Sequence, residues 1–96
     1  MQVRIRPEAE SDIEDAYKWY ESQRKGLGES FILCIEEALS RASRNPNNYS
    51  VVYKKVRRIF IHRFPFGLFF VESQDYISVI AVLHARRDPK MWKKRT

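Results

Sequence analysis

The sequence predicts an α+β domain in which a helical hairpin packs on one face of a small antiparallel sheet. Apolar residues recur at helical spacing through residues 7–44 and at a spacing of two through residues 56–83. The predicted order of elements is β-α-α-β-β-β. A chain of 96 residues is enough for one domain, which we place at residues 1–96.

The first two predicted elements are a short strand and a helix. Val3 and Ile5 alternate with polar residues, which is typical of a strand with one buried face. Pro7 suits the first turn of a helix, and the acidic residues that follow it complement the helix dipole. We end this helix near Arg24, before the breaker Gly26-Leu27-Gly28. Its apolar stripe contains Ala9, Ile13, Ala16, Tyr17 and Tyr20.

A second helix follows directly and completes the hairpin. Its apolar stripe starts at Leu27, and Asn45-Pro46-Asn47-Asn48 ends the helix. The short glycine-containing connection predicts that the two helices are antiparallel. The stripe of the second helix contains Leu27, Phe31, Ile35, Ala38 and Ala42.

Three strands make up the rest of the predicted domain, at residues 57–63, 68–71 and 77–83. Pro65 and Gly67 mark the first turn, and residues 73–75 form the second. Such short links require antiparallel neighbours, so these strands form a meander.

Both faces of this meander are apolar. Strict alternation puts Leu68, Phe70, Ile80 and Val82 on one face and Phe69, Val71, Val79 and Ala81 on the other. Since the hairpin covers only one face, we expect the other to be a binding surface. The alternative is that the segment 46–55 folds over it.

Charge is distributed unevenly along the chain. The net charge is +6, but residues 1–48 carry a net −2 and residues 49–96 a net +8. This asymmetry suggests a basic face directed at nucleic acid or at an acidic protein. No apolar run approaches the length of about 20 residues that spans a bilayer, and a single cysteine forms no internal disulfide. We therefore expect a cytoplasmic protein without membrane partners.

The sequence lacks the residue patterns of common catalytic and metal sites. His62 and His84 lack a cysteine or paired carboxylate at ligand spacing, so we expect no metal site and no cofactor. Cys34 lies on an apolar helical stripe and is better explained as a core thiol. No glycine-rich phosphate loop or serine nucleophile elbow is present.

Basic and aromatic residues remain as candidates. Cations gather around residues 54–58 and 86–95, and the aromatic residues Tyr53, Phe64, Phe66 and Trp92 lie among them. Nucleic-acid surfaces combine such residue types, because cations hold phosphates and rings stack on bases. The alternative is that the basic terminus is merely solvated.

Several stretches together resemble a known family. They are Asp12-Ile13, Tyr17-Lys18-Trp19-Tyr20-Glu21, Gly26-Leu27-Gly28, Arg63-Phe64-Pro65-Phe66 and His84-Ala85-Arg86-Arg87-Asp88-Pro89. The pattern resembles the RelE/ParE toxin superfamily of type II toxin–antitoxin modules, and it is most similar to the ParE, or plasmid-stabilisation, branch. The resemblance covers nearly the whole chain and implies the same fold as the periodicity.

The resemblance implies one of two mechanisms. RelE-like members are ribosome-dependent mRNA endonucleases, whereas ParE-like members poison DNA gyrase and need not be enzymes. If the chain is a nuclease, its catalytic residues are Arg58, His84 and Arg87. However, Gly67 stands where the nuclease branch has an arginine, and Trp92 cannot transfer a proton. We therefore favour gyrase inhibition, and keep as alternatives the nuclease, a degenerate toxin and a non-enzymatic interaction domain.

The resemblance also implies a cognate antitoxin with an acidic C-terminal segment, held in a toxin–antitoxin hetero-oligomer. We expect it to wrap the sheet, with carboxylates at Arg57, Arg58 and Arg63. Its apolar anchors are expected on Leu68, Phe70, Ile80 and Val82, or on Phe69, Val71 and Val79 if the sheet is mounted the other way.

The basic C-terminal end is predicted to engage the target. The expected contacts are Arg86, Arg87, Lys90, Trp92, Lys93 and Lys94. A large ring adds apolar contact of the type that dominates interfaces. The alternative is that Trp92 folds back and staples the end to the sheet or the hairpin.

Overall fold

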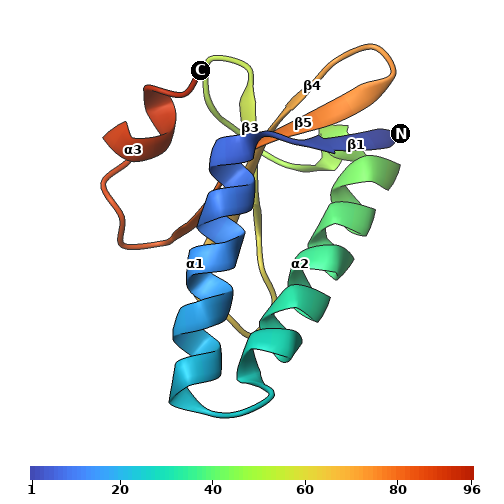
Figure 1. The fold of residues 1–96 in the computed structure, drawn as a ribbon. Helices are drawn as coiled ribbons and strands as arrows, with labels where there is room; N and C mark the ends of the chain where they lie inside the picture. The colour runs from blue at the N-terminus through green and yellow to red at the C-terminus, as the bar shows by residue number, and fades with distance from the viewer.

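The computed structural model describes residues 1–96 and contains a helical hairpin, a five-stranded sheet and a short C-terminal helix (Figure 1). In chain order the elements are β1 (Gln2–Ile5), α1 (Pro7–Gln23), α2 (Leu27–Arg44), the 3₁₀ turn η1 (Pro46–Asn48), β2 (Val51–Tyr53), β3 (Val56–Phe60), β4 (Phe66–Glu72), β5 (Tyr76–His84) and α3 (Lys90–Lys93). The predicted α+β class and the order of its main elements are confirmed.

The two long helices run antiparallel and are joined by a turn that requires glycine at two positions (Figure 1). Gly26 has a φ of 89°, a conformation that residues with a Cβ rarely adopt. At Gly28 a Cβ would lie 2.8 Å from the Tyr17 ring. The Glu21 carboxylate accepts hydrogen bonds from the backbone N–H groups of both glycines, at 3.0 and 2.9 Å. No helix of the structure is both long and apolar enough to cross a bilayer.

The sheet has the strand order β1-β5-β4-β3-β2 and differs from the prediction in two strands. β1 pairs with β5 in parallel, so the sheet is mixed rather than purely antiparallel. A tight turn makes the next strand pair antiparallel, whereas a connection through two helices also allows parallel pairing. β2 was not predicted, because its three residues are too few to show a period.

The helical hairpin covers one face of the sheet and forms the main core. The buried side chains of this core include Phe31 and Ile35 from α2, Leu68 and Phe70 from β4, and Val79 from β5. Four aromatic rings pack together at the end of this core near the turn between α1 and α2, with centroids 4.9–6.0 Å apart: Tyr20, Phe31, Phe64 and Phe66.

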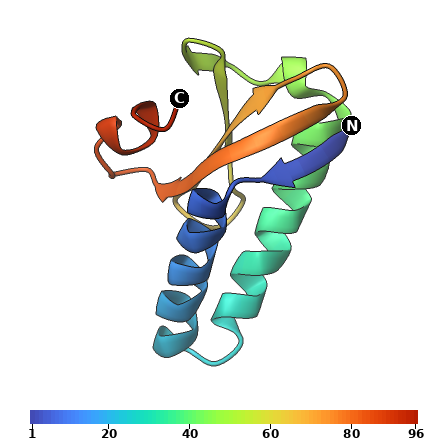
Figure 2. The same ribbon diagram turned by 45° about the horizontal axis from the view of Figure 1, so that its top comes forward.

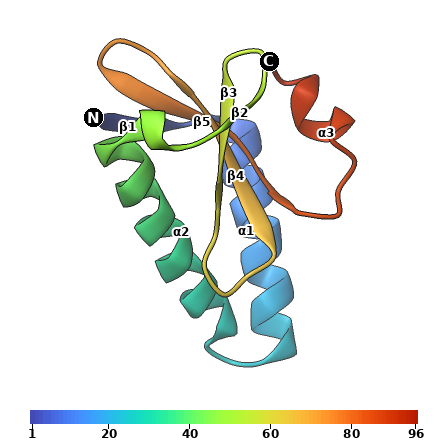
Figure 3. The same cartoon turned by 180° about the vertical axis from the view of Figure 1, so that it is seen from behind.

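The second face is also covered, so the expected exposed apolar surface is wrong. Val56, Phe69 and Ile80 are at most 5% exposed there. Two segments cover them: β2, with Val52 and Tyr53, and the C-terminal segment, with Met91 and Trp92. The alternative, that the segment 46–55 folds over this face, is therefore correct for β2, and the C-terminal segment covers the rest. Figures 2 and 3 show α3 on the side of β5 away from the hairpin.

A β-bulge explains why the predicted faces were wrong for β5. Phe69 pairs with Ala81 while Phe70 pairs with Val79, so Ile80 is an extra residue on β5. One extra residue reverses the alternation beyond it. Val79 consequently faces the helices, and Ile80 faces the C-terminal segment.

Candidate target-binding groove

The C-terminal segment is held on the sheet by Trp92. The indole stacks on the Phe69 ring with centroids 4.4 Å apart and meets the edge of Tyr53 at 6.1 Å. Trp92 is only 6% exposed. α3 begins after Asp88, whose carboxylate accepts a hydrogen bond from the Lys90 N–H at 3.0 Å. The alternative considered for this ring, that it folds back as a staple, is the arrangement found.

An ion pair fixes the end of the chain to α1. The Arg95 guanidinium donates to both carboxylate oxygens of Asp12, at 2.7 and 3.2 Å, and to the Ile80 carbonyl at 3.1 Å. The same Asp12 carboxylate accepts the Val82 N–H at 2.9 Å. These contacts satisfy backbone groups of β5 where β1 no longer runs beside it. The C-terminus is therefore part of the fold rather than a solvated tail.

The predicted target-binding residues separate into two groups. Trp92 is buried, and Lys93 lies with its ammonium 5.0 Å from the centre of the Tyr53 ring, so these two belong to the cover of the sheet. The other four are exposed: Arg86, Arg87, Lys90 and Lys94. An indole that meets the target directly is inconsistent with this conformation, whereas the four exposed cations remain candidates.

The three residues considered as catalytic for a nuclease lie around one groove. Arg58 comes from β3, His84 from the end of β5, and Arg87 from the turn that follows. The groove has a volume of about 190 Å³ and is lined by no acidic side chain. Neither arginine takes part in any of the four ion pairs of the structure. Two unpaired guanidinium groups in an acid-free groove are suited to bind a phosphate or a carboxylate.

His84 is oriented by its neighbours. Its Nδ1 accepts the backbone N–H of Arg86 at 3.0 Å, which leaves Nε2 as the nitrogen that can exchange a proton with a ligand. The edge of Phe66 packs on the imidazole with ring centroids 5.5 Å apart. A single imidazole is thus the one proton-transfer group that lines the groove.

Gly67 forms part of the groove wall. A Cβ at this position would lie 3.3 Å from Cδ of Arg58, which is tighter than ordinary van der Waals contact. The stem of Arg58 therefore occupies the space beside this backbone. Its guanidinium reaches on to the Phe60 ring, 4.5 Å from the centroid.

Sequence reasoning missed Phe60 as part of this groove. The ring is 57% exposed and lies on β3 two residues after Arg58, hence on the same face. The spacing of two on a predicted strand could have placed Phe60 beside Arg58 from the sequence alone. The pairing of Asp12 with Arg95, which fixes the C-terminal cover, was not predicted because 83 residues separate them.

The residues expected to anchor an antitoxin are not accessible. Leu68, Phe70 and Val82 are at most 1% exposed because α1 and α2 cover them, and Ile80 lies under the Trp92 cover. The alternative set fails for the same reason at Phe69 and Val79, which are at most 5% exposed, while Val71 is half-buried.

The basic residues of the antitoxin set do reach the surface. Arg63 is exposed and Arg58 lines the groove, whereas Arg57 donates to the Tyr49 carbonyl at 2.7 Å. After Arg57, β3 has no strand partner on the β2 side, although the Arg58 N–H still donates to the Ser50 carbonyl at 3.2 Å. A strand edge without a full partner therefore lies beside the Arg58 cation.

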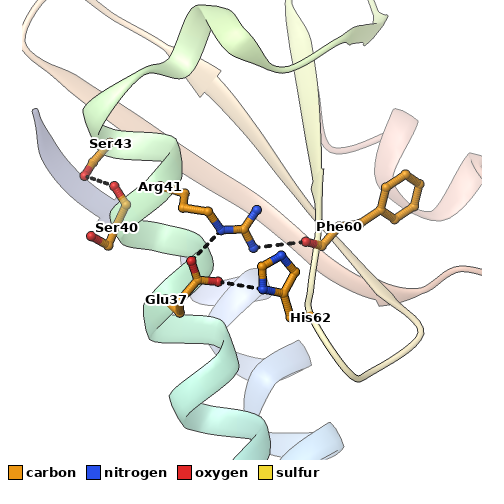
Figure 4. A network of polar contacts seen from close by, with 6 residues as sticks. All are labelled: Glu37, Ser40, Arg41, Ser43, Phe60 and His62. Atoms are coloured by element: carbon orange, nitrogen blue, oxygen red, sulfur yellow. Dashed lines mark hydrogen bonds and ion pairs between the residues drawn. The ribbon is translucent and has the colours of Figure 1, made fainter.

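A polar network borders this open edge of β3. Figure 4 shows the Glu37 carboxylate of α2 between Arg41, at 2.6 Å, and His62, at 3.4 Å. Arg41 also donates to the Phe60 carbonyl at 3.3 Å. The hydrogen bond from Arg41 lowers the pKa of Glu37 below its ordinary value and raises the pKa of Arg41. The network ties α2 to the end of β3.

No three His, Cys, Asp or Glu side chains gather in a way that could hold a metal ion. Cys34 is a half-buried free thiol on α2 beside the main core.

Comparisons with known proteins identify the relatives of this fold. The family model described as "ParE toxin of type II toxin-antitoxin system, parDE" matches residues 3–89. A solved structure described as "Chromosomal ParDE TA system from P. aeruginosa" superposes with a TM-score of 0.77 at 17% identity, over 88% of this chain and 95% of that one. A search of curated proteins found no match. The family match stops at Pro89, so α3 and Arg95 lie beyond it.

Proposed function

Because the chain belongs to the ParE toxin family of type II toxin–antitoxin systems, we propose that it inhibits growth by poisoning DNA gyrase. The acid-free groove around Arg58, His84 and Arg87 is the surface we assign to the target. Its role is to bind an anionic part of the gyrase–DNA complex without cleaving nucleic acid itself.

One observation carries the choice of binding over cleavage. RNA cleavage by attack of a ribose 2′-OH needs a base, an acid and a cation for the phosphate oxygens. The groove offers two cations but a single proton-transfer group, His84, one of whose nitrogens already accepts a backbone N–H. Gly67 supplies no side chain, and the Trp92 ring is buried. The groove is thus better equipped to hold an anion than to cut RNA.

The test is a pair of assays on the purified chain. With gyrase, ATP and plasmid, we expect loss of supercoiling and an accumulation of linear DNA that remains bound to the enzyme. With programmed ribosomes, we expect intact mRNA. Cut mRNA with normal supercoiling would overturn the proposal. Inactivity in both assays would point to a degenerate toxin or a plain interaction domain.

A ribosome-dependent endonuclease is the second candidate, favoured by one feature. Arg58, His84 and Arg87 come from three separate parts of the chain and line the same groove. A nuclease that relies on His84 would lose at least about 100-fold in cleavage rate on His84→Gln, because general acid–base catalysis contributes this much. A gyrase inhibitor would lose little with this variant, since glutamine still donates a hydrogen bond.

We further propose that an acidic, extended segment of a cognate antitoxin adds to the open edge of β3. Both sheet faces are covered, so an added strand must pair with an edge, and we choose β3 over the edge strands β1 and β2 because of the side chains beside it. Phe60 is exposed there, and Arg58 and Arg63 provide complementary charge. Such a segment would also cover the groove, which explains how binding neutralises the toxin.

The antitoxin proposal is tested with charge reversals. Once the partner is isolated from the native host, Arg63→Glu should weaken its binding at least about tenfold, as expected when a cation meets a carboxylate at an interface. Arg44→Glu is the matched control, because Arg44 is also an exposed cation and lies at the end of α2. Equal losses in both variants would show a non-specific charge effect instead.

A further inference from the structure

A second cleft adjoins the groove, between α1 and the end of β5, which meet side by side in Figure 2. It has a volume of about 360 Å³ and is lined by the aromatic rings of Trp19, Tyr20 and Phe66. His84 and Arg87 line both the cleft and the groove, so the two hollows are neighbours that share a wall.

The aromatic wall of the cleft combines a free ring with a rigid support. Trp19 is 56% exposed, although an indole is costly to leave in water. Its neighbour Tyr20 lies nearly parallel to it and packs against Phe31, Phe64 and Phe66. The wall is therefore preformed, and one large planar face is left without a partner.

The polar groups of the cleft differ from those of the groove. Of its two carboxylates, Asp12 is engaged by Arg95 and the Val82 N–H, whereas Asp15 is exposed. The groove has only cations and His84. The cleft thus offers a flat ring and a hydrogen-bond acceptor, and its neighbour offers positive charge.

We infer that the groove and the cleft together bind one unpaired nucleotide, with its phosphate between Arg58 and Arg87 and its base in the cleft against Trp19. Each hollow matches one half of this ligand: guanidinium groups hold phosphate, and an exposed ring stacks on a base. A base in a duplex is already stacked and cannot enter. The protein should therefore prefer single-stranded nucleic acid to a duplex.

Asp15 gives the cleft a base preference. A carboxylate accepts hydrogen bonds from the exocyclic amino groups of cytosine, adenine and guanine, whereas the one donor of thymine or uracil, the ring N3–H, lies between two carbonyl oxygens that repel a carboxylate. We expect oligothymidine to bind more weakly than oligocytidine, and Asp15→Asn to reduce the difference. The inference concerns which nucleotide the groove and the cleft bind, and it holds whether gyrase or the ribosome is the target.

The test uses the fluorescence of Trp19. The chain has two tryptophans, so Trp92→Phe leaves Trp19 as the single indole while it keeps a ring on Phe69. Titration with a single-stranded tetradeoxycytidine should quench this fluorescence saturably, and a longer, stable blunt-ended duplex that contains the same four cytidines as base pairs should not. In the otherwise unaltered chain, Trp19→Ala should weaken binding of a fluorescein-labelled tetranucleotide at least about fivefold, the low end expected for loss of base stacking.

Two controls keep the outcome clear. Trp19→Ala removes an exposed side chain, and circular dichroism verifies that the fold is kept; Arg87→Gln should weaken binding and reduce its salt dependence. Equal affinity for single strand and duplex would overturn the inference. So would quenching of Trp19 by an acidic peptide without aromatic residues but not by oligonucleotides, which would assign the cleft to a protein partner. Because gyrase is absent from the assay, failure here leaves the proposed function intact.

Discussion

The two faces of the sheet are both buried, but they are covered in different ways. On one face two helices of 17 and 18 residues form a core of fourteen buried side chains. On the other, a three-residue strand and a four-residue helix cover a cluster of six buried side chains, one of which, Trp92, belongs to that helix. Burial alone therefore says little about how firmly a surface is held.

The cover of the second face consists of β2 and the C-terminal segment with α3, and it depends on few contacts. We refer to it as the thin cover. Trp92 provides the ring that closes it, and the Arg95–Asp12 pair holds its end. Loss of either leaves nothing of similar size nearby, whereas the helical face has many alternative contacts. Local opening should therefore begin at the C-terminus.

The largest expected effect is at the centre of the helical face. Phe70→Ala should lower the free energy of unfolding by about 3–5 kcal/mol, because the site is fully buried and cannot collapse easily. Urea denaturation measures the change. Phe60→Ala is the matched control, since this ring is 57% exposed and its loss should cost less than about 0.5 kcal/mol.

Next in size is the ring of the thin cover. Trp92→Ala should cost about 3 kcal/mol, the low end for a buried aromatic ring, because a terminal segment can relax after the loss. Trp19→Ala should leave the urea midpoint nearly unchanged, as Trp19 is half exposed. Hydrogen exchange should show the extra opening confined to α3 and β2. Uniform loss of protection would contradict a separate, thinly covered face.

The ion pair comes third. Asp12→Asn keeps an acceptor for the Val82 N–H but removes the charge that faces Arg95, and both side chains of the pair are less than 20% exposed. We expect a loss of about 1.5–3 kcal/mol, the range for a hydrogen bond to a charged group. Asp15→Asn, on the same helix but exposed, should change stability little. Comparable losses in the two variants would mean that helix charge, and not the pair, matters.

The smallest effect concerns Glu37 and depends on pH. The Arg41 hydrogen bond lowers its folded-state pKa, so its contribution is complete above its ordinary value of 4.5 and is lost as the pH falls through the lowered pKa. Glu37→Gln should therefore flatten the decline of thermal stability below pH 4.5. Glu36→Gln, exposed and adjacent, serves as control. An unchanged acid limb in Glu37→Gln would argue against the network shown in Figure 4.

Much of the fold was predictable because long elements show their period. The helix start at Pro7, the second helix of the hairpin and the meander were predicted correctly. The bulge at Ile80 was not, since an extra residue in an all-apolar strand leaves no mark in the sequence. Because of the bulge, Val79 and Ile80 were assigned to the wrong faces of the sheet in the sequence analysis.

The candidate site was predictable only in part. Arg58, His84 and Arg87 were named from family resemblance, and the structure brings them together. The placement of Trp92 was open, because a four-residue helix has no readable amphipathic pattern and an aromatic residue near a terminus suits either a core or an interface. Only its partners, Phe69 and Tyr53, decide the question.

The C-terminal segment is a structural cover of the second sheet face. Thermal unfolding of a chain that ends at Pro89, compared with the full chain, tests this role. We predict a melting temperature lower by at least about 10 °C, since a loss of about 3 kcal/mol shifts a domain of this size by 4–8 °C per kcal/mol. An unchanged melting temperature together with lost toxicity would contradict the claim and return Trp92 to the target interface.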